Sequence, residues 1–67
     1  MADIIKVYGD GQERFSRSFE TVQEARDYLV FQADFVATLG HRVVLADQDF
    51  IVVVTAEDAV FRYEVRT

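Results

Sequence analysis

The sequence predicts an α+β fold in the order β-β-α-β-β-β, with one helix packed on one face of an antiparallel sheet. Five short segments carry alternating or continuous apolar residues and are separated by turn residues, which is typical of strands. One central segment has apolar residues at helical spacing between a capping signal and a glycine. Short turns between consecutive strands favour antiparallel pairing with the helix across one face. We expect residues 1–67 to form a single domain.

The first two strands are expected at residues 4–8 (IIKVY) and 14–19 (RFSRSF). The pair Asp10–Gly11 between them is a strong hairpin signal, because tight turns need residues that accept a positive φ. In the second strand, Phe15 and Phe19 are expected on one face of the sheet and the two serines on the other.

The helix is expected to follow Thr21 and to run to about Leu39. Thr21 and Glu24 fit a capping box, in which the hydroxyl and the carboxylate each satisfy a backbone amide. Gly40 is placed to end the helix in a left-handed conformation. The stripe expected to face the sheet consists of Val22, Ala25, Leu29, Ala33 and Val36.

Three strands are expected after the helix, at residues 42–46, 50–55 and 60–66. The last one alternates cleanly, as an antiparallel strand with one covered face does. The strand 50–55 (FIVVVT) is apolar on both sides, whereas one helix covers only one face of a sheet. The second face is therefore expected to be apolar in part. It is predicted to hold Ile4, Tyr8, Val44 and one apolar set from strand 50–55, bordered by Lys6, Arg62 and Arg66.

Two interpretations of the second face remain. It is either a surface patch shielded by long arginine side chains or an interface with another copy or another protein. A chain of 67 residues hides only about 60% of its unfolded surface and is marginally stable alone. With no cysteine and a single histidine, His41, neither disulfides nor a zinc site are available as reinforcement. Self-association is the means of reinforcement that remains.

The charge balance favours a basic protein partner. Twelve acidic and seven basic residues give a net charge of -5, which opposes direct binding to nucleic acid and to anionic membranes. No apolar stretch is long enough to span a bilayer, and no secretion signal is visible. A soluble cytoplasmic location is expected.

No catalytic, cofactor-binding or metal-binding motif appears, so we expect no enzymatic activity and no cofactor. Ser16 and Ser18 have no histidine nearby in the sequence to act as a base. The turn at residues 47–49 lacks the length and further ligands of a calcium loop, and a cation or small-ligand site there is kept as a third hypothesis.

The carboxylates collect in the turns and on the helix. Turn and helix-start preferences account for much of this pattern, while an acidic surface presented to a basic partner is the functional interpretation. Phe31 points nearly opposite Leu29 among carboxylates, with Phe35 one turn later. This arrangement is typical either of an interaction hot spot or of an isolated surface aromatic. The predicted partner-binding residues are Glu24, Asp27, Phe31, Asp34, Phe35, Asp47 and Asp49.

In size, acidity and β-β-α-β-β-β plan, the whole chain resembles the small acidic phage-encoded anti-CRISPR proteins. Its segment 19–29 (FETVQEARDYL) is also similar to the strand-into-helix part of many small ββα modules. The resemblance implies a stoichiometric inhibitor, acting in the host cell, that blocks DNA recognition or nuclease recruitment by a bacterial defence complex. In its extreme form such an acidic surface imitates the phosphates of DNA. The alternative is a homo-oligomeric structural or accessory module whose second sheet face is a dimer interface.

Overall fold

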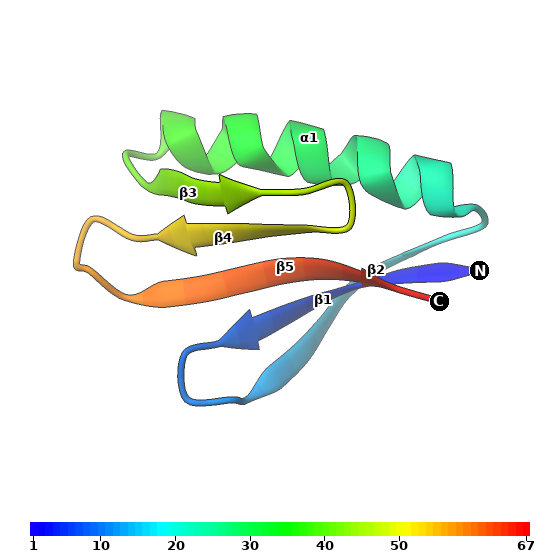
Figure 1. Cartoon of the computed structure of the whole chain (residues 1–67), viewed down its shortest axis with the longest axis horizontal. Coiled ribbons are helices and arrows are strands. Elements are labelled where there is room, and N and C mark those ends of the chain that lie inside the picture. The colour runs from blue at the N-terminus through cyan, green and yellow to red at the C-terminus, as the bar shows by residue number, and fades with distance from the viewer.

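A computed structural model describes residues 1–67 and shows one helix on a five-stranded antiparallel sheet (Figure 1). The elements follow the chain in the order β1 (Ala2–Tyr8), β2 (Glu13–Phe19), α1 (Val22–Thr38), β3 (Arg42–Ala46), β4 (Phe50–Val54) and β5 (Val60–Arg66). The predicted α+β class and the predicted order of elements are confirmed. No helix in the structure is both long enough and apolar enough to cross a membrane.

The strands lie in the order β2-β1-β5-β4-β3, so β5 occupies the centre of the sheet. It pairs antiparallel with β1 on one side and with β4 on the other. The edge strands are β2 and β3. Two local hairpins, β1–β2 and β3–β4, are thus joined into one sheet only through β5 (Figure 1).

The capping signals set the ends of α1. The Thr21 hydroxyl oxygen accepts a hydrogen bond from the Glu24 backbone N–H at 3.2 Å, as predicted. The Glu24 carboxylate accepts from the Thr21 hydroxyl at 3.0 Å rather than from the backbone amide that a capping box predicts. At the other end Gly40 has a φ of +90°, and the backbone N–H groups of Gly40 and His41 each donate to a carbonyl of the last turn at 3.1 Å. These bonds form a Schellman motif, which satisfies carbonyls that the helix would otherwise leave without partners.

The core lies between α1 and the three central strands. It contains nine buried residues: Ala2, Ile4, Ala25, Leu29, Val36, Ile51, Val53, Phe61 and Tyr63. The predicted helical stripe is confirmed, with Val22 and Ala33 half-buried at its margins. Because only nine of 67 residues are buried, the core is small even for a chain of this length.

The predicted orientation of β1 is wrong. Ile4 is fully buried under the helix, and Tyr8 and Lys6 lie on the same side of the strand. The Lys6 ammonium is 4.3 Å from the ring centroid of Phe61, where cation and ring attract each other. The alternation within β1 does not indicate which side of the strand faces the helix, because Ile4 and Ile5 are equally apolar. The register against β5 decides which of them faces the helix.

The prediction that Phe15 and Phe19 share a face is also wrong, because a β-bulge lies between them. Phe19 pairs with Ala2, whereas Phe15 pairs with Ile5, and the register shifts in between. The extra residue moves the alternation by one position. Phe19 therefore packs against Tyr28 of the helix at a ring-centroid distance of 5.3 Å, and Phe15 lies on the opposite side of the sheet.

A second bulge lies in β3 and corrects the predicted place of Val44. Val43 pairs with Val53 on the helix side and Leu45 pairs with Val52 on the other side, with the register shift between them. Leu45 therefore takes the place on the second face that was predicted for Val44. Val44 itself lies at the bulge.

We call the side of the sheet that α1 does not cover the open face. Its apolar residues, assigned from the strand registers, are Ile5, Val7, Phe15, Leu45, Phe50, Val52, Val54 and Val60. The predicted apolar set from strand β4 is confirmed, and Arg62 and Arg66 lie on this face as predicted.

Candidate functional site: an acidic groove beside the helix

The largest concavity is a groove between α1 and the turn that joins β3 to β4, with a volume of about 420 Å³. In Figure 1 this turn lies directly below the helix. The groove is lined by Gln23, Arg26, Asp27, Leu29, Val30, Ala33, Asp34, Ala46, Asp47, Gln48 and Ile51. Its lining combines apolar side chains with three carboxylates, and we call it the acidic groove.

Helical spacing brings two of the carboxylates to the groove. Asp27 and Asp34 are seven residues apart, so they lie on one flank of the helix about 10 Å apart along its axis. Asp47 comes from the β3–β4 turn and contributes the third carboxylate. Its side chain accepts a hydrogen bond from the backbone N–H of Gln48 at 2.6 Å, which orders the turn.

The one basic residue of the lining is already paired. The Arg26 Nε lies 2.8 Å from the Asp49 carboxylate, and both side chains are partly exposed. This hydrogen bond raises the pKa of Arg26 above its already high value, so the guanidinium stays cationic. Because Asp49 balances Arg26, the carboxylates of Asp27, Asp34 and Asp47 set the net charge of the groove.

The structure brings four of the seven predicted partner-binding residues to the acidic groove. Asp27, Asp34 and Asp47 line it, and Asp49 contacts it through Arg26. Glu24, Phe31 and Phe35 do not line the groove.

Phe31 belongs to a row of rings on the other flank of the helix. Its ring lies 6.3 Å from that of Tyr28, which in turn contacts Phe19 at 5.3 Å. The Arg17 guanidinium lies 5.5 Å from the Tyr28 ring. Phe31 is 63% exposed, so its predicted exposure is confirmed, and Phe35 is 49% exposed. Phe31 is therefore the outer end of an aromatic row rather than an isolated surface ring.

Sequence reasoning missed the apolar part of the groove. Val30 is 67% exposed and lies outside the stripe that faces the sheet, and this exposure was readable from its position one residue after Leu29. The contributions of Ala46 and Ile51 depend on how the β3–β4 hairpin approaches the helix, which no local pattern indicates.

The third hypothesis placed a cation or small-ligand site at the turn of residues 47–49. The Asp49 carboxylate is bound by Arg26, and the structure contains no group of three His, Asp or Glu side chains arranged to hold a metal ion.

Comparisons of the chain with protein-family models, with curated proteins and with solved structures gave no match.

Proposed function

We propose that this chain is a non-enzymatic binding protein that occupies a basic, nucleic-acid-handling surface of a partner protein and thereby blocks it. The observation that carries the proposal is the acidic groove, where Asp27, Asp34 and Asp47 surround apolar side chains and the only cation is neutralised. An anti-CRISPR protein acting in the cytoplasm on a bacterial defence complex is the specific form that the resemblance implies.

The groove suits the side chains with which proteins hold nucleic acids. Arginine and lysine carry long apolar stems that pack against residues such as Val30, while their charged ends reach carboxylates. The same side chains neutralise phosphates when DNA or RNA is bound. A partner whose cations are engaged by Asp27, Asp34 and Asp47 is therefore unable to use them for nucleic acid.

Electrostatic attraction also governs how the complex forms. The net charge of -5 speeds the encounter with a basic surface at low ionic strength. Since the three carboxylates of the acidic groove are close to solvent, salt weakens this attraction. The screening length is roughly 8 Å at physiological ionic strength. We expect the association rate to fall as salt is added and the dissociation rate to change much less.

The experiment compares two charge reversals of equal size. The groove variant carries Asp27→Lys and Asp34→Lys, and the control carries Asp10→Lys and Glu57→Lys in two turns that do not line the groove. Each protein is immobilised and exposed to nuclease-treated extract of the bacterial host. The captured partner is then purified, and fluorescence anisotropy measures whether each variant displaces labelled DNA from it.

Wild type and the control variant are expected to displace DNA, and the groove variant is expected to fail. If both variants lose displacement equally, only net charge matters and the groove is not the site. If the groove variant still displaces DNA, the proposal is wrong. The variant Phe31→Ala then tests the aromatic row. If Phe31 anchors the partner, this variant is expected to bind it at least roughly tenfold more weakly than wild type does.

A further inference from the structure

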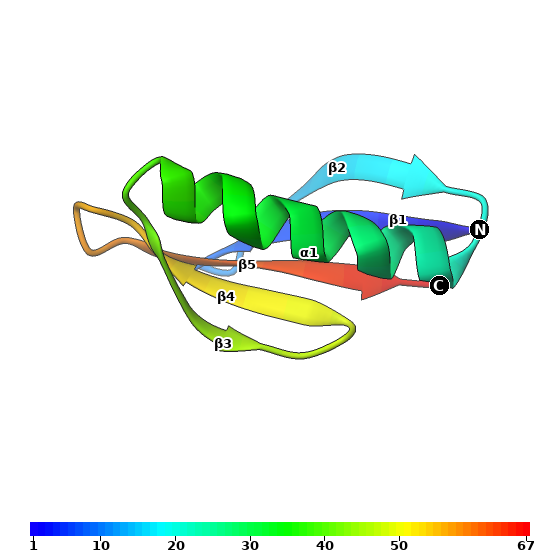
Figure 2. The ribbon, with the colours of Figure 1, turned by 90° about the horizontal axis from the view of Figure 1, so that it is seen from above.

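The open face has no covering element. The single helix lies across the opposite side of the sheet (Figure 2), so the apolar residues of β1, β2, β3 and β4 on this face remain in contact with solvent. Phe15 is 59% exposed, Leu45 is 55% exposed and Val60 is 49% exposed. With the other apolar residues of this face they form two apolar strips, one on the β1–β2 hairpin and one on the β3–β4 hairpin, which Val60 of β5 extends beside Val54.

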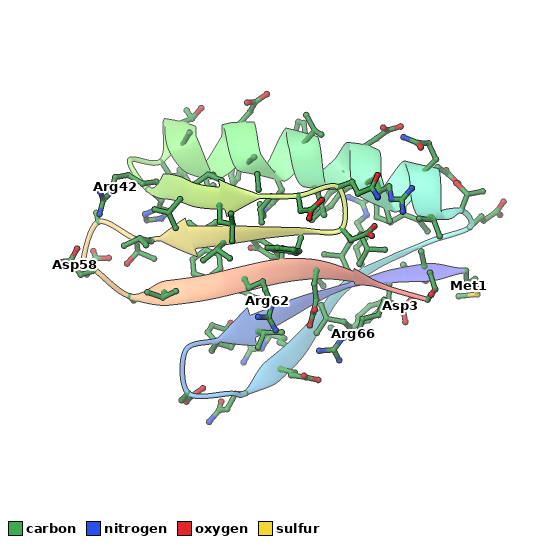
Figure 3. The ribbon with its side chains drawn as sticks, viewed as in Figure 1. Met1, Asp3, Arg42, Asp58, Arg62 and Arg66 are labelled. Atoms are coloured by element: carbon green, nitrogen blue, oxygen red, sulfur yellow. The ribbon has the colours of Figure 1, made fainter.

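Between the strips, Arg62, Glu64 and Arg66 of β5 form a row of paired charges that Glu13 of β2 completes. The Arg66 guanidinium contacts the Glu13 carboxylate at 2.6 Å and the Glu64 carboxylate at 2.5 Å, and Arg62 lies 3.6 Å from Glu64. Figure 3 shows Arg62 and Arg66 extending from β5 away from α1. Two arginines and two glutamates thus balance one another on this part of the open face.

We propose that the open face is an interface with a second copy of this chain. Besides the four residues of the charge row, the open face carries only Asp3 and Arg42 as charged residues, which gives three acidic and three basic side chains. The other nine acidic and four basic residues account for the whole net charge of -5 and lie elsewhere. A basic partner is therefore drawn away from the open face, whereas two open faces, each without net charge, meet without local repulsion.

The charge row also fits its own copy. In a two-fold arrangement with antiparallel β5 strands, Arg62 of one copy lies opposite Glu64 of the other, and the reverse pair forms by symmetry. Because both side chains are already paired within the chain, this pair of residues brings no unpaired charge into the interface.

The sheet edges are poorer candidates for self-association. The β2 edge carries Glu13, Arg14 and Arg17 and contains a bulge, and the β3 edge contains the bulge at Val44. Charges and bulges are the features by which edge strands avoid pairing with another sheet. The face is therefore the surface on which a second copy packs.

The size of the face sets the expected affinity. Five strands spaced about 4.8 Å apart, each 5–7 residues long, give a face of roughly 400–550 Å² per copy. Two such faces bury about 1,000 Å² in total, at the lower end for a specific interface. We expect dimerisation at micromolar to submillimolar concentrations rather than an obligate dimer.

Sedimentation velocity from about 5 µM to 1 mM measures the dissociation constant of wild type and of two matched variants. The open-face variant carries Phe15→Ser and Leu45→Ser, and the control carries Val30→Ser and Phe31→Ser, which are similarly exposed on the helix side. Circular dichroism confirms that each variant is folded.

The wild type and the control are expected to dimerise alike, and the open-face variant to dimerise at least roughly tenfold more weakly. A wild type that stays monomeric at 1 mM overturns the proposal. The proposal is also overturned if the open-face variant still dimerises and the control variant does not, because the helix side is then the interface. Neither result affects the displacement of DNA by the acidic groove, so the two proposals fail independently.

Discussion

The orientation of β1 makes the sharpest prediction about stability, because two neighbouring isoleucines have different environments. Ile4 is fully buried beneath the helix, whereas Ile5 is half-buried on the open face. Changing each to alanine removes the same atoms and the same β-propensity, so the difference between the two variants reports burial alone.

The magnitudes follow from the atoms removed. Ile→Ala deletes three carbons, which at about 0.8 kcal/mol each gives about 2.4 kcal/mol, and the cavity at Ile4 raises the cost to about 3–4 kcal/mol. At Ile5 about half of the transfer term is lost and no closed cavity forms, so we expect about 1 kcal/mol. A 67-residue domain has a total stability of only about 3–10 kcal/mol, so Ile4→Ala removes much of it.

Urea unfolding followed by circular dichroism below 5 µM protein, where self-association is not expected, measures both costs. A difference of about 2 kcal/mol corresponds to melting temperatures about 8–16 °C apart for a domain of this size. If Ile4→Ala does not fold, the milder pair Ile4→Val and Ile5→Val is compared instead. Equal costs, or a larger cost at Ile5, would refute the register of β1 against β5.

Three further predictions concern single residues and use the same unfolding assay. Thr21→Ala removes the helix N-cap and should cost about 1 kcal/mol, while Thr21→Ser should cost much less; equal costs contradict the cap. Gly40→Ala should cost about 1 kcal/mol through its φ of +90° alone, since the added carbon meets no atom within 4 Å; an unchanged stability contradicts that conformation. The hydrogen bond from Arg66 lowers the pKa of Glu13 below its usual 4.5. The contribution of this ion pair to the free energy of unfolding is therefore present above pH 4.5 and is lost as the pH falls through the lowered pKa that Glu13 has in the folded state. The stability gap between wild type and Glu13→Gln should therefore be larger at pH 7 than at pH 3, and a gap independent of pH contradicts the pairing.

The fold was predictable where local chemistry decides it. Capping residues fixed both ends of the helix, a glycine-containing turn marked the first hairpin, and helical spacing identified the buried stripe. The two bulges were not predictable, because Phe15 and Phe19 keep the even spacing of a regular strand and residues 43–45 are all apolar, so neither sequence marks where the register shifts. The bulge in β2 separates Phe15 from the face of Phe19, and the bulge in β3 puts Leu45 on the open face in place of Val44.

The site was predictable only in its charges. Asp27 and Asp34 share a flank because they are seven residues apart, and the exposure of Phe31 follows from its angle to the stripe. The contact between the β3–β4 hairpin and the helix brings Asp47 to Asp27 and Asp34. The same contact leaves Phe31 and Phe35 outside the groove. The order of the strands determines this contact, and the sequence contains no signal for that order.

The central place of β5 has a consequence for the rate of folding. Each hairpin brings together residues close in sequence and forms in about 1–10 µs, but the pairing of Asp3 with Arg66 closes a loop of more than sixty residues. The entropy of that closure is lost before the contacts of β5 compensate for it. The two hairpins are therefore expected to form and dissolve many times before β5 joins them, and variants in β5 should slow folding more than variants in the edge strands.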